Sequence, residues 1–350
     1  MAYTTIDNPG LFFKTVIYAG NSTDNTAITG VGFQPDLVWL RNRNNVENHL
    51  WQDSVRGASG GEFYYIQSNT TAGDQTQGDG DGVVSLDSDG FTLGYNNSTG
   101  WNQTSSNYVA WNWLGANGTA SNGNGSITST VSVNTTAGFS IVSYTGTGSN
   151  ATVGHGLGAV PKMIMVKRIS GNGYDWVVYH KDKTAGLYLN SDGYNNDSSS
   201  NNIWFNGAAP TSSVFSIGTD GRIGDATDFI AYCFAEKPGY SKFGSYTGNG
   251  NADGTFVYTG FKPQFIIQKP VSTTQNWQIH DTKRPGYNVK NYNLSSNNNN
   301  AEADNEFIDI VSNGFKNRTN GALNSSGVTY IYMAFGQSLV GSNNVPCTAR

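Results

Sequence analysis

Short apolar runs alternate with stretches of glycine, asparagine, aspartate and serine along most of this chain. Runs of about four to eight residues that contain Val, Ile, Trp, Tyr and Phe, and that are bounded by such turn formers, are typical of β-strands. The segments Phe13–Tyr18 and Phe139–Tyr144 partly alternate between apolar and polar residues, which predicts one buried and one solvated sheet face. Long stretches with the helical apolar period of about 3.6 residues are missing. The best helix candidate, Ala301–Val311, fits a strand equally well.

The strand pattern recurs three times with its anchor residues in the same order. The first anchor is a Tyr-x-Gly sequence, and the second is a proline that precedes an apolar strand ending in a basic residue. Steps of 126 and 102 residues separate both the tyrosines and the prolines. The remaining anchors are a Trp-centred strand, a turn followed by a short strand, and an aromatic closing strand. The anchoring tyrosines, prolines and basic residues are Tyr18, Tyr144, Tyr246, Pro35, Pro161, Pro263, Arg41, Lys167 and Lys269.

These anchors predict an all-β chain of three tandem antiparallel β-sandwich domains of jelly-roll or lectin-like type. We expect unit one at 1–115, a Gly/Asn/Ser linker at 116–126, unit two at 127–236, and unit three at 237–350 with a C-terminal tail. Such a linker is flexible, whereas units two and three join through the tight turn 235–239. Unit one is therefore expected to move independently of a pair formed by units two and three.

Composition narrows the classes of partner. The formal net charge is -5 and 13% of residues are charged, so Asn, Ser, Thr and Gly must supply the solubility. Nucleic-acid binding needs clustered Lys and Arg, which the chain lacks. Membrane insertion is not expected, because no apolar run approaches about 20 residues. Cys233 and Cys347 do not suggest a disulfide framework. The N-terminus lacks signal-peptide features, so we expect synthesis in a reducing cytoplasm.

Each unit carries polar residues beside a tryptophan. One interpretation is a sugar-binding site in which a ring and its polar neighbours are displayed together. The other is that the tryptophan fills the sandwich and the polar residues fix the following loop. The second interpretation is favoured because each cluster follows the same strand in every unit. The candidate binding residues are His49, Trp51, Asp53 and Arg56 in unit one, Trp176 and His180 beside Asp175 in unit two, and Trp277, His280, Asp281 and Arg284 in unit three.

Catalytic and metal chemistry find little support in the sequence. A polarised Ser or Cys or a pair of carboxylates does not stand out, so we expect no catalytic residues and no enzyme. The segment Gly78–Gly82 resembles a fragment of a calcium loop but lacks the full spacing of oxygen ligands. Zinc-ligand spacing and a phosphate-binding glycine loop are also missing. We therefore expect no metal and no cofactor.

Several longer motifs resemble the repeated motifs of virion proteins from marine tailed phages, of the kind found in cyanophages and pelagiphages. They are Phe33–Arg43, Asp53–Gly57, Ser88–Gly94, Tyr108–Trp113 and the ending Val340–Arg350. The resemblance covers essentially the whole chain. It implies a tail-fibre or other structural protein on the virion surface, synthesised in the cytoplasm of the host bacterium. It does not identify a receptor or a catalytic residue.

The leading functional hypothesis is a non-enzymatic virion protein that forms a surface appendage: a tail fibre, a head fibre or a decoration. It would contribute to host attachment or particle assembly, with other virion proteins as partners and a homo-oligomer, preferably a trimer, as its assembled state. The alternative is a carbohydrate-binding module that recognises glycans of the host envelope. A polysaccharide depolymerase ranks third, because short repeated sandwiches differ from the long solenoid that usually carries such chemistry.

Overall fold

The structure, a computed structural model, describes residues 6–76, 78, 82–95, 100–284 and 288–337. Within these residues the regular secondary structure consists of β-strands and two short 3-10 helices, η1 (Pro9–Leu11) and η2 (Phe205–Gly207). Every ladder between the named strands is antiparallel. The predicted all-β, antiparallel fold is confirmed. The helix candidate at 301–311 contains the strand Ala303–Val311 instead.

Unit one contains a five-stranded sheet, a three-stranded sheet and a small hairpin. The five-stranded sheet has the order β1 (Phe13–Ala19), β10 (Asn107–Trp113), β3 (Leu37–Asn42), β4 (Leu50–Asp53) and β7 (Tyr65–Gln67). The three-stranded sheet has the order β2 (Thr26–Ile28), β9 (Gly90–Leu93) and β8 (Val83–Asp87). The hairpin is β5 (Ala58–Ser59) with β6 (Glu62–Phe63).

Units two and three extend the same arrangement. In unit two a seven-stranded sheet runs β11 (Ala120–Asn122), β12 (Ser129–Asn134), β13 (Phe139–Thr145), β19 (Asp228–Phe234), β15 (Met163–Arg168), β16 (Val177–His180) and β17 (Lys183–Tyr188). Its second layer is β14 (Ala151–Gly154) with β18 (Val214–Ile217). In unit three an eight-stranded sheet runs β20 (Ser241–Thr247), β27 (Thr329–Gly336), β22 (Pro263–Pro270), β23 (Gln278–Asp281), β24 (Lys290–Ser295), β25 (Ala303–Val311), β26 (Gly314–Asn317) and β21 (Phe256–Tyr258).

One strand order recurs in the three main sheets. The opening strand of each unit pairs with the closing strand, which pairs with the strand that follows the proline, which pairs with the Trp-centred strand. These series are β1-β10-β3-β4, β13-β19-β15-β16 and β20-β27-β22-β23. The register is also shared, because each anchoring tyrosine lies opposite the first aromatic residue of its closing strand: Tyr18 opposite Tyr108, Tyr144 opposite Phe229, and Tyr246 opposite Tyr330.

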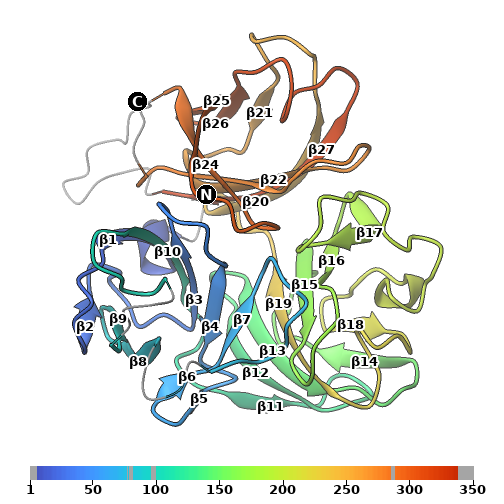
Figure 1. The fold of residues 1–350 in the computed structure, drawn as a ribbon. Coiled ribbons are helices and arrows are strands. Elements are labelled where there is room, and N and C mark those ends of the chain that lie inside the picture. The colour runs from blue at the N-terminus through green and yellow to red at the C-terminus, as the bar shows by residue number, and fades with distance from the viewer. Residues whose placement is uncertain (1–5, 77, 79–81, 96–99, 285–287, 338–350) are drawn as a thin grey trace.

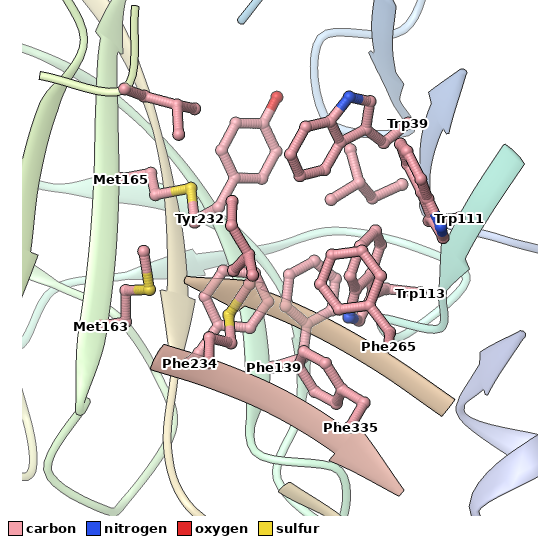
Figure 2. Packing of buried hydrophobic residues seen from close by; sticks show 14 of the residues in the cluster. Trp39, Trp111, Trp113, Phe139, Met163, Met165, Tyr232, Phe234, Phe265 and Phe335 are labelled. Atoms are coloured by element: carbon pink, nitrogen blue, oxygen red, sulfur yellow. The ribbon is translucent and has the colours of Figure 1, made fainter. Parts of the chain in front are cut away.

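The central strands of each main sheet are buried on both faces. In β3, Val38 and Leu40 pack into a core inside unit one, between its two sheets, whereas Leu37 and Trp39 point to the opposite face. That opposite face belongs to a second core, to which all three units contribute. Figure 2 shows this common core, where Trp113, Phe234 and Phe335 come from three different units. A strand covered on both sides has no polar face, which explains why all six residues of β3 are buried.

The common core corrects the expected layout of the chain. The three units surround one core instead of following each other in a row (Figure 1). The predicted flexible linker at 116–126 is also wrong, because Ala120–Asn122 forms β11 and pairs with β12. The carboxylate of Asp36 in unit one accepts hydrogen bonds from the backbone N–H groups of Gly115 and Asn117 and from the hydroxyl of Ser132. Unit one therefore has no freedom to move independently of unit two.

Two further expectations concern single segments. Cys233 lies fully buried in β19, as the apolar run around it predicts. Cys347 and the rest of the tail at 338–350 lie outside the described residues, as do residues 79–81 of the calcium-loop fragment.

Candidate functional site

The ten candidate binding residues are buried, and all of them except His280 lie where the units meet. Nine of them are at most 1% exposed, and the side chain of the tenth, Arg56, is also 1% exposed. They lie on the Trp-centred strand of each unit, β4, β16 or β23, or in the segments that directly flank these strands. His280 lies within β23, opposite Ile266 of β22. Trp51 packs in the common core against Trp176 and Tyr232 of unit two, with ring centroids 5.2 and 4.9 Å apart. The other eight make or support polar contacts across the seams, which are the boundaries between neighbouring units.

A first set of seam contacts joins a ring nitrogen to a backbone carbonyl of the neighbouring unit. The position that is His49 in unit one is Trp176 in unit two and Trp277 in unit three. The distances are 3.0 Å from His49 Nε2 to the Ser295 oxygen, 2.9 Å from Trp176 Nε1 to the Gln67 oxygen, and 3.0 Å from Trp277 Nε1 to the Tyr188 oxygen. Unit one thus contacts unit three, unit two contacts unit one, and unit three contacts unit two. The contacts close a ring.

The hydrogen bonds around His49 assign its tautomer. Trp39 Nε1 donates to His49 Nδ1 at 3.0 Å, so Nδ1 carries no proton. Nε2 is then the protonated nitrogen and donates to the Ser295 oxygen. Burial lowers the pKa of His49 well below its ordinary value, and the nearby Arg41 lowers it further, which keeps the ring neutral. A neutral histidine can therefore make the same contact as the indole of the other two units.

A second set of contacts closes the ring in the opposite sense. Asp53 of unit one accepts a hydrogen bond from the Tyr232 hydroxyl of unit two at 2.7 Å, and Asp281 of unit three accepts one from Trp111 Nε1 of unit one at 3.1 Å. The third seam differs, because Met333 replaces these donors on β27. There His180 Nε2 of unit two lies 3.2 Å from the backbone oxygen of Tyr332 in unit three instead. Burial lowers the pKa of His180 to about 4.

Asp53 and Asp281 have matching arginine partners. Arg56 Nε donates to Asp53 at 2.5 Å, and Arg284 Nε donates to Asp281 at 2.6 Å. Each aspartate also accepts backbone N–H groups from the turn that follows it. A second carboxylate, Asp74 or Glu302, contacts the other side of the arginine. In unit two the positions that correspond to the aspartate and the arginine are His180 and Lys183, which form no such ion pair. This is also the seam in which Met333 replaces the Trp or Tyr donor.

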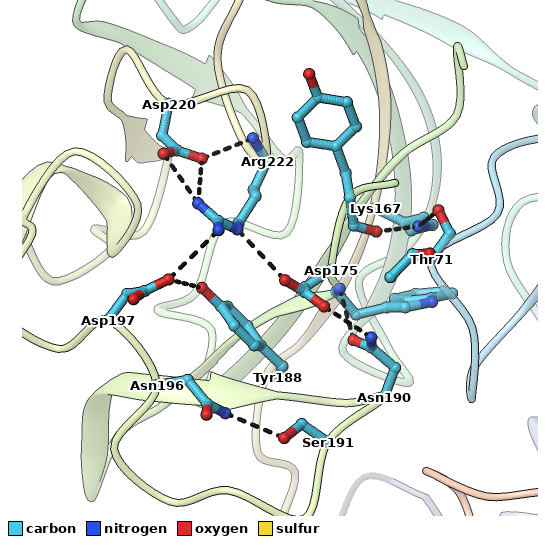
Figure 3. Close-up of polar contacts among 12 residues, drawn as sticks. Thr71, Lys167, Asp175, Tyr188, Asn190, Ser191, Asn196, Asp197, Asp220 and Arg222 are labelled. Atoms are coloured by element: carbon cyan, nitrogen blue, oxygen red, sulfur yellow. Dashed lines mark hydrogen bonds and ion pairs between the residues drawn. The ribbon is translucent and has the colours of Figure 1, made fainter. Parts of the chain in front are cut away.

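A third set of contacts involves the basic residue that ends each proline-led strand. Lys167 Nζ donates to the backbone oxygen of Thr71 in unit one at 3.0 Å, as Figure 3 shows. Lys269 Nζ donates to the backbone oxygen of Asp192 in unit two at 2.6 Å. Arg41 donates to the backbone oxygens of Asn299 and Asn300 in unit three, at 2.8 and 2.6 Å. Burial lowers the pKa of Lys167 and of Lys269 to about 7.

These placements correct the sugar-binding interpretation of the ten residues. A glycan cannot stack on Trp51, Trp176 or Trp277 while these rings are buried in the common core. The aspartates do fix the loop that follows them, as the other interpretation expected. The space that the tryptophans fill lies between the units, however, and not inside a single sandwich.

A comparison with protein families matches residues 8–338, a span that includes all three units. The chain belongs to the DUF7483 family. The family is described as "Domain of unknown function (DUF7483)". Searches of curated proteins and of solved structures return no match to the chain. One DUF7483 domain therefore corresponds to the whole three-unit body, in agreement with its shared core.

A charged cluster that the sequence did not predict lies on unit two of the DUF7483 domain (Figure 3). Arg222 contacts the carboxylates of Asp175, Asp197 and Asp220 at 3.5, 3.3 and 3.1 Å. Its guanidinium lies 5.6 Å from the centre of the Tyr188 ring. Because these residues come from separate segments and follow no spacing rule, only Asp175 had a sequence signal. The cluster anchors the loop before η2 to the sheet.

The described part of the DUF7483 domain contains no group of three or more His, Cys, Asp or Glu side chains placed to hold a metal ion. Within the same residues there is no helix of sufficient length and apolar character to cross a membrane.

Proposed function

We propose that this chain is a non-enzymatic structural protein of a phage virion, displayed on the particle surface as a tail fibre, a head fibre or a decoration. The observation that carries the proposal is the closed ring of three units around one core. Phage appendages are commonly trimeric, and a body with three similar units can present three similar surfaces to a threefold partner. The motif resemblance to virion proteins and the polar surface with few charges support the same role.

The proposed role needs rigidity more than chemistry. Ring nitrogens, aspartates and basic residues join each unit to both of its neighbours. Such contacts hold the relative positions of the three outer surfaces, so that weak contacts made by each surface add to give avidity. The partners are other virion proteins and further copies of the chain, with a trimer favoured.

Mass spectrometry of gradient-purified virions tests the proposal. We expect the chain to co-purify with the major capsid protein at a constant ratio across the particle peak. A phage-encoded replication protein serves as the control that must fall to background in the same fractions. Presence of the chain in the lysate, together with its absence from the particle peak, would exclude a virion role. Antibody labelling of intact particles then distinguishes head from tail.

A carbohydrate-binding module is the second candidate. It is favoured by an observation separate from the buried clusters, namely the exposure of the aromatic residues Phe256 and Tyr258 on β21.

A further inference from the structure

Strand β21 of unit three exposes two aromatic side chains. Phe256 is 47% exposed and Tyr258 is 60% exposed, whereas Val257 between them is 5% exposed and packs into the core of unit three. Because side chains alternate along a strand, the two rings share the outward face, about 7 Å apart along the backbone. β21 is the last strand of its sheet, on the side of unit three away from the other units (Figure 1).

The fold does not require rings at these two positions. The residue between them is an apolar one that lies opposite a buried phenylalanine in every unit: Ile28 opposite Phe91, Val153 opposite Phe215, and Val257 opposite Phe315. Small residues flank this position in the other two units, namely Ala27 and Thr29 in unit one and Thr152 and Gly154 in unit two. Units one and two build the same strand without rings, so the aromatic pair has another use.

The charged residues beside the rings neutralise each other. Lys316 lies opposite Phe256 on β26 and forms an ion pair with Asp253. Arg318 lies 3.4 Å from Asp309 and 3.9 Å from Asp253. Lys316 and Asp253 adjoin the rings, and Arg318 and Asp309 extend this cluster across β26 to β25, so that its two bases and two acids leave no excess charge. A charged ligand gains no net attraction from such a border, whereas a neutral, hydroxyl-rich ligand finds both donors and acceptors.

We propose that Phe256 and Tyr258 form a stacking platform for a neutral glycan. The C–H faces of consecutive sugar rings would pack on the two aromatic rings, and the sugar hydroxyls would bond to the bordering Lys316, Arg318, Asp253 and Asp309. The proposal does not depend on a virion location. Particle composition tests the location, and the binding assay below tests the platform, so either can fail alone.

Native affinity gels that contain a neutral glucan, mannan or galactan test the platform with the full chain, and a sulfated galactan serves as the charged comparison. We expect at least one neutral polymer to retard the wild-type chain. The double variant Phe256→Leu/Tyr258→Leu keeps apolar side chains but removes the rings, and it should bind about tenfold more weakly. The swap Phe256→Tyr/Tyr258→Phe should retain the binding. Tyr95→Ala removes a ring that is 48% exposed on unit one and should leave the binding unchanged.

The platform is refuted if no neutral polymer retards the wild-type chain, or if the sulfated polymer alone does. Equal retardation of the wild type and the Leu/Leu variant would also overturn it, because a contact that survives ring removal is not stacking. Sedimentation of each variant over a range of concentrations adds a further test. A dimer that forms with wild type and disappears with Leu/Leu would assign the rings to a contact between copies instead of a glycan.

Discussion

At the scale of single residues, the Tyr-x-Gly anchor has one structural role in every unit. Each tyrosine ring stacks on the aromatic residue opposite it, with centroids 4.9, 5.2 and 4.9 Å apart. Each hydroxyl donates to a backbone carbonyl, that of Trp101, Ile223 or Leu323. The glycine then passes close to the loop that holds this carbonyl. A Cβ on Gly20, Gly146 or Gly248 would lie within 2.3 Å of a backbone oxygen.

The glycine can be tested by adding a methyl group. Gly20→Ala would place Cβ 2.2 Å from the Gln103 oxygen, so the backbone must shift. We expect a loss of about 1–3 kcal/mol in the free energy of unfolding, measured by urea denaturation. Gly118→Ala is the matched control, because its Cβ would meet open space. Equal stability of the two variants would show that the close approach is not tight.

The seam aspartates have a separate test. Asp281→Ala removes the carboxylate that pairs with the Nε of the buried Arg284 and removes the acceptor for Trp111 Nε1. Removing one partner of a buried pair costs about 3–5 kcal/mol, and we expect a loss of that size in urea unfolding. Lys181→Ala removes the partly exposed ion pair between Lys181 and Asp182 and should cost less than about 1 kcal/mol. A similar cost for both variants would contradict the role of Asp281 in the seam.

At the scale of elements, the strands that follow the prolines end at seams. Strands β3, β15 and β22 carry their basic residue into the neighbouring unit, where it binds backbone carbonyls. The element thus contributes to two cores and one seam, because its alternate residues face different units.

The two seam lysines predict a stability that rises with pH. Burial lowers the folded-state pKa of Lys167 and Lys269 to about 7, from an ordinary value of 10.5. Between these values the unfolded lysine binds a proton that the folded one does not. The free energy of unfolding should therefore increase with pH across this window, by up to about 1.4 kcal/mol per pH unit for each lysine, and this gain is lost as the pH falls to 7.

Urea unfolding at about pH 7 and about pH 9 measures this slope. Lys167→Met removes one titrating group and should reduce the gain, and the double variant with Lys269→Met should reduce it further. Lys181→Met changes a lysine whose side chain is 34% exposed and should leave the slope at its wild-type value. An unchanged slope in the double variant would mean that the two buried lysines stay charged in the folded protein.

At the scale of the whole molecule, the shared core makes the three units one folding unit. The common core takes large rings from every unit, among them Trp39, Tyr232 and Phe265. The ring centroids of Trp39 in unit one and Phe265 in unit three lie 6.3 Å apart. A unit removed from the ring would expose one whole apolar sheet face to water.

Calorimetry tests this cooperativity. We expect one unfolding transition for the full chain, with a calorimetric to van't Hoff enthalpy ratio of about 1. A chain that ends at residue 236 lacks unit three and should bind a hydrophobic dye or aggregate, because the faces of units one and two that meet it would be open. Two or more separate transitions, of the kind given by independent sandwiches, would contradict the shared core.

The sequence by itself determined the strands and their threefold recurrence. Turn formers bound the strands and aromatic or β-branched residues fill them, and both signals are local. The anchors also marked the residues of the candidate site, although the sequence could not say what they contact. His49, Trp176 and Trp277 occupy equivalent positions, yet only their carbonyl partners in other units distinguish a seam from a sugar site.

Only the tertiary structure decided what covers the second face of each sheet. An apolar run such as that of β3 shows that both faces are buried, but it does not say which segment buries them. The covering residues lie one or two hundred residues away, since Trp39 packs near Phe265. For the same reason a Gly- and Asn-rich segment predicted a linker, whereas the nearby β12 makes part of it a strand. Burial across distant segments is a property of the assembled ring, because the partner of each apolar face is chosen by packing in space and not by neighbours in the chain.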